Sequence, residues 1–254
     1  MTPSARHVHV EHVMGGPVTI EVRDPDLAAC DRNDAIAAAV HLLHHIDATF
    51  TTFDDASDIR RLDAGTLELS DCPPDVADVL AHAAILHRGT RGAFDIRAAA
   101  DRHLDPSGLV KGWAAQRVAD LLCAAGSRHH LVNAAGDIAA FGGAAPGIPW
   151  QVGIEHPLAP GQLCAIVPVT TGAVATSGTA ARNTHVIDPC TRQPATALAS
   201  ATVTGPKLGD ADAYATAAIA LGLDAPNFLT SLPNHEAMLI DATGHIWFTP
   251  GWPP

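Results

Sequence analysis

Apolar and polar residues alternate at the start of the chain, and a period of two is the pattern of a half-buried β-strand. Residues 7–10 and 18–22 both show it, and Gly15 and Gly16 between them suit a turn, so the two segments are predicted to pair. Short apolar runs typical of strands recur later. They lie at residues 130–133, 138–141, 150–154, 164–169, 174–177, 185–187, 201–203, 238–240 and 245–248, and the last two are predicted to form a hairpin.

Other segments have the spacing of helices, with apolar positions three and four residues apart. Helices are predicted over residues 26–49, over residues 73–87, from Gly112 to about Ala125, and around Asp212. Pro74 suits the first turn of the second helix, and Gly126 suits the end of the third. Because strands outnumber helices and do not alternate strictly with them, the predicted fold class is α+β, with mixed sheets and packed helices, rather than a doubly wound sheet.

Composition and charge narrow the choice of partners. The chain has 254 residues, of which 47% are hydrophobic, and this is enough for a single domain over residues 1–254. Its net charge of −12 repels nucleic acid and anionic lipid, so neither is expected as a partner. No apolar run has the length of a signal peptide or a membrane span, and the five cysteines include no Cys-x-x-Cys pair. We therefore expect a cytoplasmic protein with reduced thiols and no membrane span.

The first candidate for chemistry is the acid-rich segment 209–217. If this segment is helical, Asp212 and Thr216 are four residues apart and project from one face. A carboxylate and a hydroxyl on one turn suit Mg²⁺, which completes its octahedron with water and substrate phosphate. The alternative is that Asp212 only caps the helix or interacts with its dipole.

A second candidate is the segment 104–112, which places Asp105, Lys111 and Gly112 before a predicted helix. Backbone N–H groups at a helix start, together with a lysine, can hold a phosphate. The alternative is a turn with a solvated lysine. Residues 92–95 and 133–138 suit either a ligand site or ordinary turns.

The fifteen histidines suggest a zinc site as a further alternative. His41, His44 and His45 share one predicted helix, and His7 and His9 share a strand face. Neither group has a nearby cysteine or a His-Glu-x-x-His pattern, so solvated faces are expected there.

Taken in order along the chain, these clusters resemble the ApbE family, the FAD:protein FMN transferases, over nearly the whole sequence. The matching motifs are Met14-Gly15, residues 50–53 and 57–62, Gly92 to Asp95, Asp105 to Gly112, Asn133 to Ile138, residues 176–178, residues 185–189, and Asp212 to Thr216. The resemblance implies an ApbE-like (T-fold-like) architecture and an enzyme that uses Mg²⁺ to cleave the pyrophosphate of FAD. The FMN half would go to a threonine or serine hydroxyl of an acceptor flavoprotein, and AMP would leave.

The resemblance also implies a set of site residues. The metal ligands would be Asp212, Thr216 and the backbone carbonyl of Gly108. FAD would contact Met14, Phe53, Ala93, Phe94, Asp95, Asp105, Lys111 and Ile187. His185 and Asp188 are the two candidates for the base that accepts the proton of the acceptor hydroxyl. An FAD pyrophosphatase, with water replacing the acceptor, and a flavin-binding module without turnover are the alternative functions.

The chain departs from the family pattern at three positions and in the length of one segment, because the stretch between Gly178 and His185 is short. Phe53 replaces the usual tyrosine, which keeps a stacking face and removes a hydroxyl. Ala135 replaces the first of two glycines in the turn after Asn133, and Arg192 replaces the glycine that ends the motif beginning at Asp188.

Overall fold

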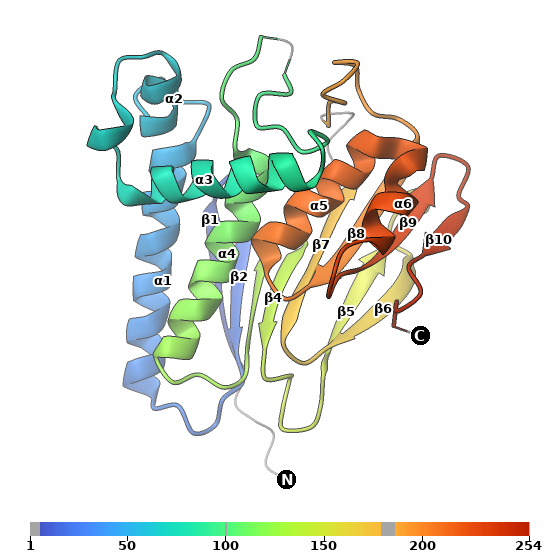
Figure 1. The fold of residues 1–254 in the computed structure, drawn as a ribbon. Helices are drawn as coiled ribbons and strands as arrows, with labels where there is room; N and C mark the ends of the chain where they lie inside the picture. The colour runs from blue at the N-terminus through green and yellow to red at the C-terminus, as the bar shows by residue number, and fades with distance from the viewer. Residues whose placement is uncertain (1–5, 100, 179–185, 254) are drawn as a thin grey trace.

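Two β-sheets of unequal size define the architecture, and helices cover one face of the larger sheet (Figure 1). The computed structural model describes residues 6–99, 101–178 and 186–253. In spatial order, the larger sheet contains β1 (His7–Val13), β2 (Gly16–Val22), β3 (His130–Ala134), β4 (Asp137–Phe141), β7 (Gly172–Gly178), β8 (Leu198–Gly205), β9 (Glu236–Asp241) and β10 (Ile246–Phe248). The smaller sheet pairs β5 (Trp150–Glu155) with β6 (Leu163–Val169). All strand pairs among the described residues are antiparallel.

Six α-helices and two short 3₁₀ turns are found in the described part of the chain. The helices are α1 (Ala29–Phe50), α2 (Asp58–Asp63), α3 (Pro74–Gly89), α4 (Ser107–Ala124), α5 (Leu208–Leu221) and α6 (Ala225–Thr230), and the 3₁₀ turns are η1 (Leu69–Asp71) and η2 (Gly222–Asp224). None of these helices is long and apolar enough to cross a membrane.

The main core lies between the helices and the larger sheet. Alternate strand residues such as Ile20 and Val132 face Leu43 and Leu109 of the helices, and all four are fully buried. Helix α5 is rich in buried alanines, and small side chains allow it to lie close to β7, β8 and α4. This close packing places the polar residues of α4 and α5 next to each other.

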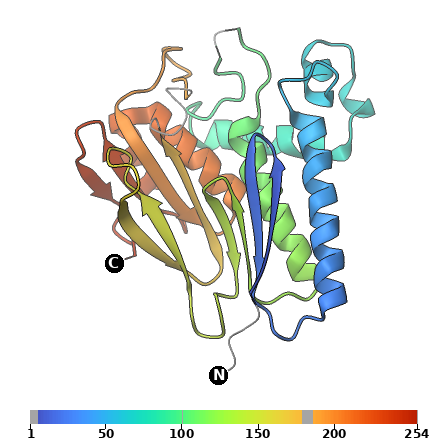
Figure 2. The same ribbon diagram turned by 180° about the vertical axis from the view of Figure 1, so that it is seen from behind.

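The smaller sheet covers the other face of the larger sheet, as the rear view shows (Figure 2). In β5, alternate residues are buried, and Trp150, Val152 and Ile154 face inward. They pack in one cluster with Met238 and Ile240 of β9. The central strands are therefore buried on both faces, which fixes their register.

The structure confirms the α+β class, the pairing of β1 with β2 and the C-terminal hairpin. Two predictions of local structure were wrong. Helix α4 begins at Ser107 instead of after Gly112, because two glycines within its first turns resemble a loop in the sequence. Residues 186–187 form no regular strand, because the chain turns back after Asp188 and Ile187 makes only an isolated bridge to Pro194.

Candidate functional site

Helices α4 and α5 bring the predicted metal ligands together. Asp212 is 5% exposed, and its Oδ2 accepts a hydrogen bond from the N–H of Gly112 at 3.2 Å. Thr216 lies one turn further along α5, and its Oγ1 is 3.2 Å from Oγ of Ser177 on β7. A Cβ atom added at Gly108 would lie 3.7 Å from Oγ1 of Thr216, so the first turn of α4 adjoins this hydroxyl. Asp212, Thr216 and Gly108 thus occupy one region. The spacing of Asp212 and Thr216 predicts their shared face, and the resemblance to the family implies the position of Gly108.

The absence of a side chain at Gly112 makes this approach of α4 to α5 possible. A Cβ atom there would lie 2.9 Å from Cβ of Asp212 and 2.9 Å from the carbonyl oxygen of Leu208. Contacts this short would force the helices apart. Gly112 therefore holds Asp212 against α4 by its size as well as through its N–H group.

Lys111 lies at the same junction and pairs with a carboxylate from the sheet. Its Nζ forms an ion pair with Asp137 at the start of β4, whose side chain is 2% exposed. The other carboxylate oxygen of Asp137 accepts the N–H of Thr176 on β7 at 3.0 Å. Sequence reasoning did not single out Asp137 or Ser177 as site residues, although both lie within motifs that it recognised.

Burial and charge make the carboxyl group of Asp212 unusual. Desolvation and the negative charge of Asp137 together raise the pKa of Asp212 to about 8, although Lys111 and the Gly112 N–H oppose the increase. A carboxylate in this position is costly unless a cation accompanies it. The site therefore suits a divalent cation.

The donor set indicates what kind of cation would fit. One carboxylate and the hydroxyls of Thr216 and Ser177 are hard oxygen donors of the kind that Mg²⁺ prefers. No group of three or more His, Cys, Asp or Glu side chains in the described residues is arranged to hold a metal. Of the histidines considered for zinc, His9 and His44 are both hydrogen-bonded to Glu11, at 3.2 Å and 3.0 Å.

The predicted ligand residues of the α3–α4 connection are held by local hydrogen bonds. Phe94 is buried, its N–H donates to Oγ1 of Thr90 at 2.9 Å, and its carbonyl lies 3.0 Å from Nδ1 of His87. Its ring would be 3.5 Å from a Cβ atom at Gly108. Ala93 is also buried. The structure therefore places Ala93 and Phe94 beside the first turn of α4.

Asp95 and Asp105 serve as acceptors in turns. A carboxylate oxygen of Asp95 accepts the N–H of Arg97 at 2.9 Å, and one of Asp105 accepts the N–H of Ser107 at 3.0 Å. The N–H of Asp105 donates to the carbonyl of Ile96 at 2.8 Å, which closes the loop. In this structure both acids stabilise backbone turns, and Asp105 fixes the start of α4.

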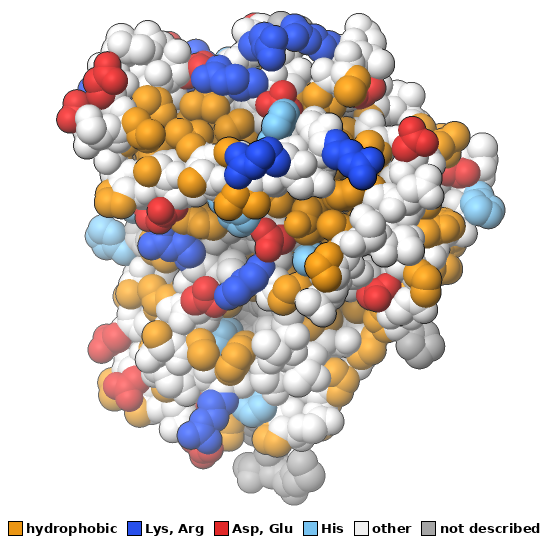
Figure 3. Space-filling view, in the orientation of Figure 1, with side chains coloured by type: hydrophobic (Ala, Val, Ile, Leu, Met, Phe, Trp, Pro, Cys, Tyr) orange, Lys and Arg blue, Asp and Glu red, His pale blue; other side chains and the backbone are white. Residues whose placement is uncertain are grey.

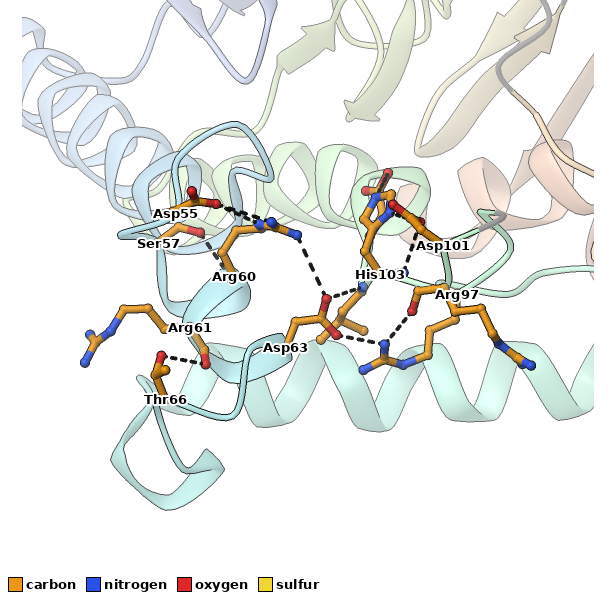
Figure 4. A network of polar contacts seen from close by, with 12 residues as sticks. Asp55, Ser57, Arg60, Arg61, Asp63, Thr66, Arg97, Asp101 and His103 are labelled. Carbon is orange, nitrogen blue, oxygen red and sulfur yellow. Dashed lines mark hydrogen bonds and ion pairs between the residues drawn. The ribbon is translucent and has the colours of Figure 1, made fainter.

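A charged network attaches this loop to α2 (Figure 4). Asp63 accepts hydrogen bonds from the Arg97 guanidinium at 2.8 Å and from the Leu104 N–H at 3.0 Å. Arg60 reaches both Asp55 and Asp63, at 3.2 Å and 4.0 Å. Basic side chains also gather at this end of the acidic chain (Figure 3).

Two predicted flavin contacts differ in their surroundings. Met14 lies in the β1–β2 turn with a positive φ of 54°, and it lines a crevice together with Lys111, Ala134 and Ala135. Phe53 lies between α1 and α2 and is 99% exposed. The structure thus brings Met14 to Lys111 but leaves Phe53 pointing into solvent.

The last group of predicted residues lies on the segment after β7. Ile187 and Asp188 are half-buried, whereas His185 falls outside the described residues. Both carboxylate oxygens of Asp188 are engaged, one by the Cys190 N–H and the other by the Thr191 hydroxyl, each at 2.8 Å. Burial alone would raise the pKa of Asp188, but these hydrogen bonds lower it overall. A carboxylate with a lowered pKa is a weak base.

Figures 1 and 2 show the α1–α2 connection, the α3–α4 connection and residues 186–197 at one end of the molecule. The buried oxygen donors and the lysine lie where α4 and α5 meet beneath this end. The fold is that of an α+β protein. The oxygen donors and Lys111 form a candidate site for a cation and a phosphate-containing ligand. The family model of the ApbE family matches residues 14–103 and 97–239, and the chain belongs to that family.

Three curated relatives share the name FAD:protein FMN transferase. An FAD:protein FMN transferase of Treponema pallidum is 35% identical over 162 residues, which cover 56% of this chain and 45% of the relative. The one of Klebsiella pneumoniae is 34% identical over 48% of this chain and 38% of its own length. The one of Haemophilus influenzae is 30% identical over 58% of this chain and 46% of its own length. The chain thus spans less than half the length of the curated relatives it matches.

Solved structures agree with the fold along nearly the whole chain. The flavin transferase ApbE of Vibrio cholerae has a TM-score of 0.85 at 20% identity, with 98% of both chains covered. The apo form of the flavinyl transferase ApbE of Pseudomonas stutzeri has a TM-score of 0.83 at 21% identity, with 98% of this chain and 97% of that chain covered. At these identities the likeness establishes the fold alone.

Proposed function

We propose that this protein is an Mg²⁺-dependent FAD:protein FMN transferase. The observation that carries the proposal is the junction of α4 and α5, where Asp212, Thr216 and Lys111 supply what a cation and a pyrophosphate require. The names of the curated relatives support the same reaction. The substrates are FAD and an acceptor flavoprotein with a threonine or serine flavinylation site.

In the proposed reaction, the oxygen of the acceptor hydroxyl forms a bond to the phosphorus of the FMN half. The bond from that phosphorus to the bridging oxygen of the pyrophosphate breaks, and AMP leaves with this oxygen. Asp212, Thr216 and the carbonyl of Gly108 would hold Mg²⁺, which when bound neutralises charge on the pyrophosphate and the leaving AMP. Lys111 provides a positive charge beside the same phosphates, and Met14 lines the crevice next to it.

The proton of the acceptor hydroxyl has to pass to a base. Asp188 is poorly suited, because hydrogen bonds engage both of its carboxylate oxygens and lower its pKa. We assign the base to His185, whose neutral imidazole can accept a proton near pH 7. The flavin would contact Phe53, Ala93, Phe94 and Ile187, and Asp95 and Asp105 would shape the loop around it.

The test is incubation of the purified protein with FAD and Mg²⁺, with and without a co-expressed candidate acceptor domain. AMP release that requires the acceptor, together with a mass gain of one FMN on its threonine or serine, is the expected result. A matched acceptor with alanine at the modified position should gain no mass. AMP without acceptor would indicate a pyrophosphatase, and bound FAD without AMP would indicate a flavin-binding module.

A further inference from the structure

A second buried carboxylate lies beside the proposed cation ligand and has no role in the proposed reaction. Asp137 is 2% exposed, begins β4 and forms an ion pair with Lys111 of α4. Asp212 is 5% exposed on α5 and is joined to α4 through the N–H of Gly112, the residue after Lys111. The side chains of Asp137, Lys111 and Asp212, which come from β4, α4 and α5, therefore lie at one junction inside the protein.

The charges of these three side chains act on one another. Lys111 forms an ion pair with Asp137, and the next residue of α4, Gly112, donates its N–H to Asp212. In a desolvated interior, unit charges interact much more strongly than in water. Asp212 has to be ionised to hold a cation, and in that state the side chains of Asp137, Lys111 and Asp212 together carry a net charge of −1 before the cation is counted. A divalent cation at Asp212 would change this to +1, the sign that a pyrophosphate requires.

We propose that Asp137 is a positioning residue that sets the cation affinity of the site: it engages Lys111, so that the lysine does not serve as the counter-ion of Asp212 in place of a divalent cation. The inference rests on the cation site of the proposed function. Without the charge of Asp137, the Lys111 ammonium would compensate more of the Asp212 charge and would compete with the metal.

The geometry separates this role from a purely structural one. Oδ1 of Asp137 accepts the Thr176 N–H at 3.0 Å, while Oδ2 faces Lys111. Asparagine keeps the shape and an oxygen for Thr176 but removes the charge that faces Lys111. A structural role would be largely preserved in Asp137→Asn, whereas the charge role would be lost.

The experiment measures Mn²⁺ binding to the full chain without FAD, from the electron paramagnetic resonance signal of free Mn²⁺. Asp137→Asn should weaken binding by at least about tenfold, because the net charge of the group rises from −1 to 0. Lys111→Met should bind Mn²⁺ at least as tightly as wild type. The double variant Asp137→Asn/Lys111→Met restores the net charge of −1 and should recover most of the wild-type affinity.

Recovery in the double variant is the decisive result, because two structural defects would add instead of cancelling. Wild-type affinity in Asp137→Asn, or no recovery in the double variant, would overturn the proposal and leave the proposed function standing. Absence of Mn²⁺ binding in the wild type would overturn both. Thermal unfolding checks each variant, and if Asp137→Asn does not fold, Asp137→Ser takes its place in both the single and the double variant.

Discussion

The two parts of the candidate site differ in how firmly the protein holds them. The cation floor consists of Gly108, Lys111, Asp137, Asp212 and Thr216, all on α4, α5 or β4. The flavin rim consists of two of the proposed flavin contacts, Phe53 and Ile187, both on connecting segments. Asp137 and Asp212 are almost completely buried, whereas Phe53 is 99% exposed. The residues of the floor are thus held by helices and the sheet, whereas Phe53 of the rim is open to solvent.

This difference follows from what each part has to do. Charges that act on a phosphate work best when they are desolvated and fixed in advance. An aromatic side chain that stacks on a flavin ring has to be accessible first, and it loses its exposed surface only on binding. Changes in the floor should therefore remove catalysis, and changes in the rim should mainly alter the affinity for FAD.

The largest expected effect is that of Asp212→Ala, which removes the only carboxylate proposed to hold the cation. AMP release should fall by at least about 10³-fold, since a catalytic metal contributes several kcal/mol of charge stabilisation. The fold should survive, because an unaccompanied buried carboxylate is costly. AMP release is measured by chromatography over a range of Mg²⁺ concentrations.

The matched control for this change is Asp210→Ala on the same helix. Asp210 is partly exposed and pairs with His82 of α3 at 2.6 Å, away from the proposed ligands. Its removal should leave turnover close to that of the wild type. Equal losses in the two variants would mean that Asp212 acts through helix α5 and not through a cation.

The second prediction concerns the hairpin of β3 and β4, which carries Asp137. His130 is fully buried at the start of β3, lies 3.0 Å from the Ser127 hydroxyl through Nδ1, and stacks on Phe141. Burial lowers the pKa of His130 from 6.5 to about 4, although the carbonyl of Ala119 opposes the change. The unfolded chain therefore binds a proton at a higher pH than the folded chain does.

The sign of the pH effect follows directly. The stabilising contribution of the neutral His130 is complete above pH 6.5 and is lost as the pH falls towards 4, by about 3 kcal/mol in all. Urea unfolding between pH 7 and pH 4.5 measures this loss. His130→Gln should show a shallower decline than the wild type over the same range, and parallel curves would exclude His130 as the cause.

A smaller effect is expected from Gly112→Ala, which tests how tightly the floor is packed. The added Cβ atom would lie 2.9 Å from both Asp212 and the Leu208 carbonyl, so the variant should lose about 1–3 kcal/mol of unfolding free energy. Gly89→Ala is the matched control, because nothing lies within 4 Å of a Cβ atom there. Urea unfolding should show no loss for the control, and an unchanged Gly112→Ala would mean that α4 and α5 can separate freely.

Much of the cation floor could be predicted from the sequence, because the positions of its residues depend on neighbours that are close along the chain. Asp212 and Thr216 are four residues apart on a helix, so their shared face depends on helix geometry alone. β1 was predictable because its apolar and polar residues alternate, and the central strands such as β8 were predictable from their short apolar runs. Family motifs then indicated which of the polar residues to propose as site residues.

What the sequence could not supply depends on distant contacts. The start of α4 was placed too late, because Gly108 and Gly112 have low helix propensity and the reason for them, the approach of α5, lies about a hundred residues away. The sequence likewise does not indicate that Lys111 pairs with Asp137. Asp137 follows a turn, where an acid is usually solvated, and only the packing of β4 against α4 buries it.

The smallest expected effect is that of Phe53→Ala in the rim. Because Phe53 is 99% exposed, its removal should change the free energy of unfolding by less than about 0.5 kcal/mol. Stacking on a flavin would be worth about 0.5–1.5 kcal/mol, so FAD affinity should fall by about two- to tenfold, as measured by quenching of flavin fluorescence.

Phe53→Tyr restores the residue usual in the family and should keep the affinity. Leu223→Ala, at another exposed apolar position (74%), is the control and should have no effect. If Phe53→Ala instead binds FAD normally but loses transfer to the acceptor, Phe53 contacts the acceptor protein, and the rim is a protein-docking surface and not a flavin site.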